Sequence, residues 1–166
     1  MKIAPRVLLM MGSDSDLPIM QEAADILKKF AVPYEMRIAS AHRSPARAMA
    51  LASEASGRGI QVIIAGAGMA AHLAGVVAAH TILPVIGVPM PGGALNGVDA
   101  LYATVQMPGG IPVATMAIGK AGAKNAGLFA IQILALSDAT FAELLIRYRV
   151  AMDKELEQKD SELQAL

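Results

Sequence analysis

The sequence predicts an α/β fold: a three-layer αβα sandwich built on a flavodoxin-like, five-stranded parallel sheet, with an extra C-terminal helix. Short apolar runs alternate along the chain with longer stretches of helical periodicity. This alternation is typical of βαβ units, whose parallel sheet is covered by helices on both faces. The 166 residues show no linker or internal repeat. We therefore expect one domain over residues 1–166, with a frayed tail from about residue 158.

Five apolar runs predict the strands of this sheet. They cover residues 6–11, 34–39, 61–65, 84–88 and 112–118. Aliphatic and β-branched residues dominate these runs, as expected for strands that are buried on both faces. The run at 34–39 instead alternates between apolar and polar residues, which also favours a strand.

The segments between and after these runs predict helices. They are expected at residues 16–30, 45–57, 70–80, 99–106, 123–136 and 139–157. In the first of them, apolar residues recur every three or four positions and share one helix face. Asp16 and Ser44 are expected to cap the first two helices, and Pro18 and Pro45 suit a first helical turn.

The middle of the chain is nearly uncharged. Asp99 is the only charged residue between Gly59 and Gly119, which suggests a membrane span, a buried sheet or a large subunit interface. The stretch 62–79 is apolar enough to suggest a membrane helix. Its glycines, its β-branched start and the lack of flanking Lys or Arg favour strand, turn and helix instead. The apolar surplus then favours burial between subunits.

Composition excludes several functional classes. The chain has no cysteine, so disulfides, thiol nucleophiles and Cys-ligated zinc are excluded. A net charge of zero and 4% aromatic residues argue against nucleic acid as a partner. The N-terminus lacks the long apolar core and the cleavage site of a signal peptide. We therefore expect a cytoplasmic protein without a membrane or nucleic-acid partner.

The loop after the first strand suits an anion. Gly12, Ser13, Asp14, Ser15 and Asp16 combine hydroxyl groups with the start of a helix, an arrangement that favours binding of a phosphate group. The alternative is that Ser and Asp here only cap the helix, which for Asp16 alone is the stronger interpretation. A metal site is not expected, because no further carboxylate or histidine lies nearby in the sequence.

The loop after the second strand, residues 40–45, places His42 beside Arg43. Arg43 stays charged and has the geometry to hold a phosphate. His42 is the natural proton carrier near neutral pH. A lone loop histidine is often an exposed bystander, but the carboxyl end of a strand is where α/β folds bind ligands.

The loop after the third strand, residues 66–71, matches the weak dinucleotide pattern G-x-G-x-x-A. The acidic ribose partner expected about 20 residues later is missing, so an NAD site is rejected. The glycines still indicate a close approach of the backbone to a ligand. From the residues alone, His72 and His80 on the following helix are interpreted as structural.

Three later segments complete a distinctive set: Gly87-Val88-Pro89, Gly97-Val98-Asp99-Ala100-Leu101 and residues 106–115. In this order and spacing, the loops and segments resemble the PurE family, and specifically its class I, N5-carboxyaminoimidazole ribonucleotide mutases. The resemblance extends to about Leu136. Met69 and Ala74 depart from it, because the commonest family loop has Gly and Pro there, which affects the shape of the pocket wall.

The resemblance implies an isomerase of de novo purine (IMP) biosynthesis that moves a carboxylate from N5 of aminoimidazole ribonucleotide to C4, through CO2 and without metal, ATP or organic cofactor. It implies His42 as the proton shuttle and Asp16 on the ribose hydroxyls. The expected phosphate ligands and their loop neighbours are Gly12, Ser13, Ser15, Ser40 and Arg43. The expected wall of the CO2 pocket is Gly66, Ala67, Gly68, Ala70, Ala71, His72 and Leu73. It further implies a homo-octamer with active sites at subunit junctions.

Two alternatives remain. A class II PurE carboxylates aminoimidazole ribonucleotide directly with CO2, although the third loop and residues 107–112 look class I. A non-catalytic flavodoxin-like module would bind a flavin or another phosphorylated ligand. The chain has six aromatic residues, none in the three loops, so no aromatic pair is available there to enclose a flavin ring.

Overall fold

Five parallel strands form the sheet in the order β2-β1-β3-β4-β5. The structure is a computed structural model that describes residues 4–165 and divides into two units, one ending at Ile131 and the other starting at Gln132. The strands, all in the first unit, are β1 (Val7–Met11), β2 (Tyr34–Ile38), β3 (Val62–Ala67), β4 (Val85–Pro89) and β5 (Ala114–Thr115). This order is flavodoxin-like, and it confirms the predicted fold class.

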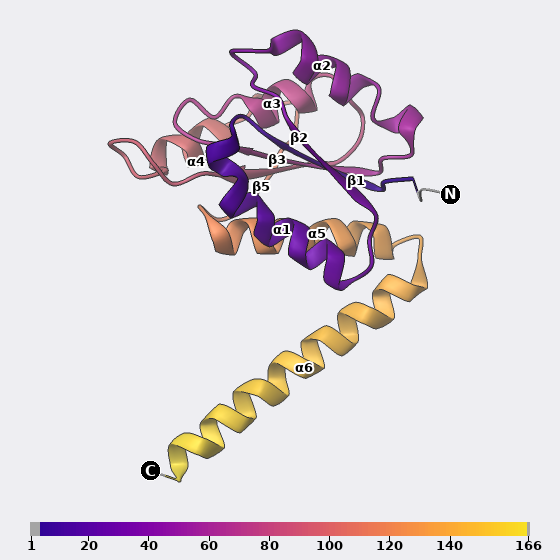
Figure 1. The fold of residues 1–166 in the computed structure, drawn as a ribbon, viewed down its shortest axis with the longest axis vertical. Coiled ribbons are helices and arrows are strands. Elements are labelled where there is room, and N and C mark those ends of the chain that lie inside the picture. The colour runs from indigo at the N-terminus through magenta and orange to yellow at the C-terminus, as the bar shows by residue number, and fades with distance from the viewer. Residues whose placement is uncertain (1–3, 166) are drawn as a thin grey trace. The chain divides into compact units, whose positions relative to one another are not determined.

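The helices of the first unit cover both faces of the sheet (Figure 1). α2 (Pro45–Ser53) and α3 (Leu73–Ala78) lie on one face, and α1 (Leu17–Lys29) and α5 (Lys120–Ala135) lie on the other. Two single 3-10 turns, η1 (Asp14–Asp16) and η2 (Ser56–Arg58), and helix α4 (Val98–Val105) complete this unit. The side chains of β1 are fully or almost fully buried, which explains its uninterrupted apolar sequence.

Three elements are clearly shorter than the sequence predicts. α2 ends at Ser53 and not at residue 57, and the 3-10 turn η2 follows it. β5 has only the pairs Ile86↔Ala114 and Gly87↔Thr115, because it is an edge strand and Pro112 has no N–H group to extend it. α3 begins at Leu73 and not at residue 70. Residues 69–72 form tight turns instead: the Ala71 N–H donates to the Met69 carbonyl at 2.8 Å, and the His72 N–H donates to the Ala70 carbonyl at 2.8 Å. These turns follow the left-handed backbone of Met69 (φ +48°).

The second unit contains α6 (Ala139–Gln164). The sequence predicts a helix end near Glu157 and a frayed tail, whereas the helix continues through Gln164. Pairs four residues apart, Lys159 with Glu155 and Gln158 with Glu162, stabilise its last turns. Because the two units are described separately, the single domain stays a prediction.

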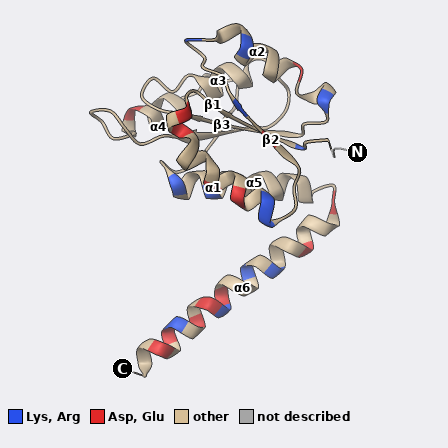
Figure 2. Cartoon of the chain, viewed as in Figure 1, with Lys and Arg blue, Asp and Glu red and all other residues tan. Residues whose placement is uncertain are grey.

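Charged side chains avoid the middle of the chain in three dimensions as well. Figure 2 shows Lys, Arg, Asp and Glu chiefly on α1, α2, α5 and α6, whereas β3, α3 and β4 contain none. The apolar stretch at 62–79 forms β3, a loop and α3, as predicted. Among residues 4–165, no helix is long and apolar enough to cross a membrane.

Candidate active site

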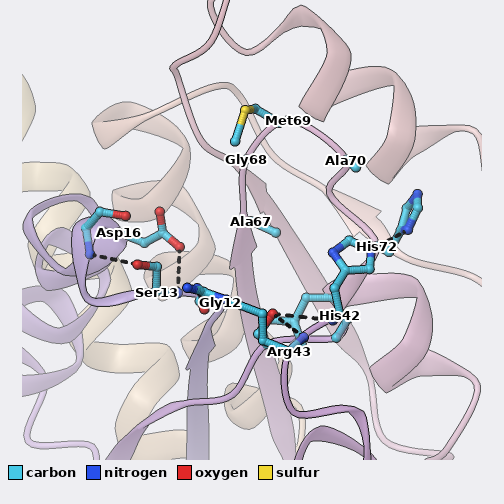
Figure 3. A pocket seen from close by; sticks show the side chains of 14 residues that line it. Gly12, Ser13, Asp16, His42, Arg43, Ala67, Gly68, Met69, Ala70 and His72 are labelled. Atoms are coloured by element: carbon cyan, nitrogen blue, oxygen red, sulfur yellow. Dashed lines mark hydrogen bonds between the residues drawn. The ribbon is translucent and has the colours of Figure 1, made fainter.

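A cavity of about 410 Å³ opens where the loops after β1, β2 and β3 meet. β1 lies between β2 and β3, so the three loops are neighbours at the carboxyl edge of the sheet. Figure 3 shows the side chains that line this cavity. They are Gly12, Ser13, Ser15, Asp16, Ser40, Ala41, His42, Arg43, Ala67, Gly68, Met69, Ala70, His72 and Leu73.

Of the predicted site residues, the structure brings together all except Gly66 and Ala71. Gly66 lies inside β3, where an added Cβ would be 2.3 Å from Met90 Cε and 2.6 Å from Met20 Sδ. It therefore makes room for core side chains and not for a ligand. Ala71 is 1% exposed, because the tight turn after Met69 directs it inward.

The loop after β1 folds around the Asp16 carboxylate. Ser13 caps η1, and its Oγ accepts a hydrogen bond from the Ser15 N–H at 3.3 Å. Asp16 Oδ2 turns back to accept the Ser13 N–H at 3.2 Å. Asp16 is the N-cap residue of α1, as predicted, but its side chain makes no cap hydrogen bond to that helix, because this carboxylate bonds to the preceding backbone.

Burial raises the pKa of the Asp16 carboxyl above its ordinary value of 3.8. The Ser13 backbone, the Ser15 side chain, the Gly12 backbone and the Arg43 charge lower this pKa, in that order, but together they do not offset the loss of hydration. The cavity therefore holds a carboxylate whose charge costs free energy, a feature that is common at functional sites.

The loop after β2 is held by its own serines. Ser40 Oγ accepts the N–H groups of His42 at 3.3 Å and Arg43 at 3.1 Å. Ser44 Oγ accepts the Ser40 N–H at 3.0 Å. Ser44 is the N-cap residue of α2, as predicted, but its side chain makes no cap hydrogen bond to that helix. The hydroxyl closes the loop instead.

Arg43 joins the first two loops. One of its terminal guanidinium nitrogens, Nη2, donates to the Gly12 carbonyl at 2.8 Å. The other N–H groups of the guanidinium can still serve an anion, since the group carries five donors. The phosphate-binding geometry expected of Arg43 is thus compatible with its structural bond.

His42 and His72 form a pair that the sequence does not reveal. His42 Nε2 lies 2.8 Å from His72 Nδ1, and the ring centroids are 4.8 Å apart at an interplanar angle of 75°. One nitrogen must donate while the other accepts, so the tautomers of the two rings are coupled. His80 has the structural role that the sequence predicts. Its Nδ1 donates to the Val76 carbonyl at 2.8 Å, and it does not line the cavity.

The predicted site omits Ala41 and Arg47, and it names Met69 only as a residue that alters the shape of the pocket wall. Ala41 lines the cavity, and Met69 lines it from the loop after β3. Arg47, one turn along α2, lines an adjoining hollow of about 490 Å³ that shares Gly12, Ser13, Ser40 and Arg43 with the cavity. The sequence did offer a signal for Arg47, because a basic residue four positions after Arg43 can lie near it. Residues 4–165 contain no group of three His, Cys, Asp or Glu side chains placed to hold a metal.

The fold and the cavity define a class: a flavodoxin-like α/β protein whose first three β-strand loops build a cavity in which a histidine lies beside hydroxyl, carboxylate and guanidinium groups. The chain belongs to the AIR carboxylase family, which matches residues 6–155.

Named relatives and a solved structure agree with this membership. An N5-carboxyaminoimidazole ribonucleotide mutase from Pyrococcus horikoshii is 55% identical over 162 residues, covering 98% of this chain and 90% of that protein. A phosphoribosylaminoimidazole carboxylase from Saccharomyces cerevisiae is 49% identical over 99% of this chain, but only 28% of the yeast protein. The crystal structure of Treponema denticola PurE matches with a TM-score of 0.86 and 30% identity, covering 96% of this chain and 98% of that one.

Proposed function

We propose that this protein converts N5-carboxyaminoimidazole ribonucleotide to 4-carboxyaminoimidazole ribonucleotide in purine biosynthesis. The observation that carries the proposal is the asymmetry of the cavity. Figure 3 shows Ser13 and Asp16 at one end of the cavity, with Arg43 and His42 on the loop after β2. Ala67, Gly68 and Ala70, from the segment at the end of β3, form the remaining wall. The high identity to proteins named as this mutase supports the same reaction.

The polar side suits the ribose phosphate. Arg43 and the hydroxyls of Ser13, Ser15 and Ser40 hold the 5′-phosphate in this proposal. Ser40 Oγ already accepts two backbone N–H bonds, which leaves its own O–H to donate to an anion. Asp16 accepts hydrogen bonds from the ribose hydroxyls, a role that compensates a buried carboxylate for its lost hydration.

His42 carries the proton in both halves of the reaction. In the first half it gives a proton to N5 as the bond between N5 and the carboxylate breaks, and the electron pair of that bond stays on N5. In the second half C4 forms a bond to the freed CO2, and the proton lost from C4 returns to His42. A group that donates and then accepts near neutral pH is best a histidine.

The apolar side suits CO2. Ala67, Gly68, Ala70 and Leu73, with the His72 ring, form the wall in this proposal, while Gly66 and Ala71 lie behind it. Small uncharged side chains leave room for CO2 and exclude the water that would hydrate it. We propose that this reaction needs no metal and no organic cofactor.

Direct carboxylation of aminoimidazole ribonucleotide by CO2 is a second candidate. The yeast relative is named as a carboxylase, and its similarity covers almost all of this chain. The two reactions share the carboxylated product, so they differ in which substrate the enzyme accepts.

The assay that separates these functions compares two substrates with purified protein, EDTA and no ATP. We expect fast conversion of the N5-carboxylated substrate, and much slower carboxylation of aminoimidazole ribonucleotide in bicarbonate. The reverse preference would establish the second candidate. His42→Asn is the matched control: we expect no turnover with an unchanged melting temperature. A fully active His42→Asn protein would exclude the proton-shuttle role.

Assembly and location complete the proposal. We propose a cytoplasmic homo-octamer, as family resemblance implies. Exposed apolar side chains support assembly: Leu95, Val98, Tyr102 and Val105 lie close together in the sequence, and each is more than 40% exposed. Clustered exposed apolar residues often mark interfaces.

A further inference from the structure

Met69 has an unusual backbone conformation at the rim of the cavity. Its φ of +48° falls in the left-handed region, which only Ala31 and Asn96 share among the non-glycine residues of 4–165. Glycine would occupy this region without a steric penalty. A methionine that remains there despite the penalty points to a role for its side chain.

The Met69 side chain reaches from one loop to another. Figure 3 shows it on the loop that leaves β3, at the edge of the pocket. On its other side lies Gly93, where an added Cβ would be 3.2 Å from Met69 Cγ and 3.4 Å from Met69 Sδ. Gly93 itself has φ +63°, so this position has neither the space nor the backbone conformation for a larger residue. The methionine thus packs on the glycine-rich loop 91–97.

The same side chain remains 61% exposed while it lines the cavity. It is a large apolar side chain whose neighbours on the wall, Ala67, Gly68 and Ala70, are small. A flexible thioether side chain adapts its shape to an irregular opening. Its position between the cavity, loop 91–97 and solvent is that of an apolar rim at the mouth of the site.

We propose that Met69 retains CO2 in the site between the two halves of the reaction. This inference rests on the proposed function. After the bond from N5 breaks, CO2 has two fates: C4 attacks it, or it leaves and is hydrated to bicarbonate and a proton. Met69 disfavours the second fate because it narrows the apolar mouth against both CO2 and water. It is a rim residue that sets the ratio of the two fates and takes no part in proton transfer.

The test measures the fate of the carboxylate carbon. The N5-carboxylated substrate carries ¹³C in its carboxylate, the buffer contains unlabelled bicarbonate, and the label retained in the C4 product is measured by mass spectrometry. We expect Met69→Gly, which relieves the backbone penalty, to remain folded and active and to lose label several-fold more often than the natural protein. Met69→Leu, which restores apolar volume, should recover most of the retention.

Leu95→Gly is the matched control. Leu95 has a similar exposed fraction of 60% and lies in loop 91–97, but it does not line the cavity. Its removal should leave label retention unchanged, which separates the rim effect from a general loosening of that loop. Equal retention in Met69→Gly and the natural protein would overturn the inference, as would complete label exchange in the natural protein. An absence of turnover in the natural protein would instead refute the proposed function.

Discussion

The Asp16 carboxylate both bonds to the local backbone and faces the cavity. It accepts the Ser13 N–H and lines the cavity at the start of α1. Both roles require the charged form or a good acceptor, yet burial works against the charge. The residue therefore costs stability in the free protein and recovers that cost only when a ligand supplies donors.

The buried Asp16 carboxyl makes the free energy of unfolding depend on pH in a direction that can be tested. Because its pKa in the folded protein is raised, the folded state binds more protons than the unfolded state between pH 3.8 and the raised value. The contribution of Asp16 to stability therefore falls as pH rises through that window and stays low above it. Asp16→Asn removes the titration, so the free energy of unfolding of the variant minus that of the natural protein should increase with pH.

Urea unfolding between pH 3.5 and 7, at one protein concentration, measures this difference. The control is Asp14→Asn, which removes the same charge from an exposed position on the same turn. A flat difference for Asp16→Asn across the acidic range would contradict the prediction.

At this scale the sequence predicts residue types better than residue contacts. Ser13, Asp16, His42 and Arg43 stand out because polar groups after strand ends share one edge of a parallel sheet. The pairing of His42 with His72 was not predictable, because the two residues are 30 positions apart and their distance depends on how the loop after β3 turns. The misplacement of Gly66 has the same origin: it belongs to the strand and not to the loop.

The start of α5 depends on a glycine, because Gly122 has no Cβ atom to collide with the preceding chain. An added Cβ on Gly122 would lie 1.6 Å from the Ala117 carbonyl oxygen. The chain before the helix therefore crosses directly over its first turn. The backbone cannot yield there without moving either α5 or the segment that follows β5.

Gly122→Ala should accordingly destabilise the protein by about 1–3 kcal/mol or more, as overpacking against backbone does. Gly57→Ala is the matched control, because nothing lies within 4 Å of its added Cβ and its φ is not positive. Gly57→Ala should stabilise the folded protein by up to about 1 kcal/mol, because it reduces the conformational freedom of the unfolded chain. Denaturant unfolding of both variants checks the pair, and equal stabilities would show that the crossing is not as tight as described.

Element types could be predicted from periodicity, while their ends could not. The strand positions follow from apolar runs, and all five are present. The delayed start of α3 reflects the tight turns over residues 69–72, which follow the left-handed backbone of Met69, a conformation that its residue type disfavours. The end of α6 was placed too early, since the charged sequence after Glu157 was interpreted as a tail although it provides pairs four residues apart.

For the whole molecule, the uncharged segment between Gly59 and Gly119 is only partly explained by the sheet. Ile82 is 99% exposed, and Leu95 and Tyr102 are each 60% exposed. A monomer would present these side chains to water, at a cost that burial between subunits removes.

Light scattering coupled to size exclusion tests the assembly. We expect a mass about eight times the 17.2 kDa of one chain. Tyr102→Glu, which places a charge on the exposed apolar surface of α4, should reduce this mass, while the exposed Lys28→Glu on α1 should not. A natural protein that elutes as a monomer at working concentration would refute the octamer.

The bond from Arg43 to the Gly12 carbonyl has a consequence for the speed of binding. It ties together two loops whose bonded residues are 31 positions apart in the chain, so the proposed anion-binding end is assembled before any ligand arrives. An incoming ribonucleotide then pays little conformational entropy at that end and need not wait for a loop to close. In the proposed function the same guanidinium holds both the Gly12 carbonyl and the ligand phosphate. The bound phosphate would therefore strengthen the link between the loops that follow β1 and β2.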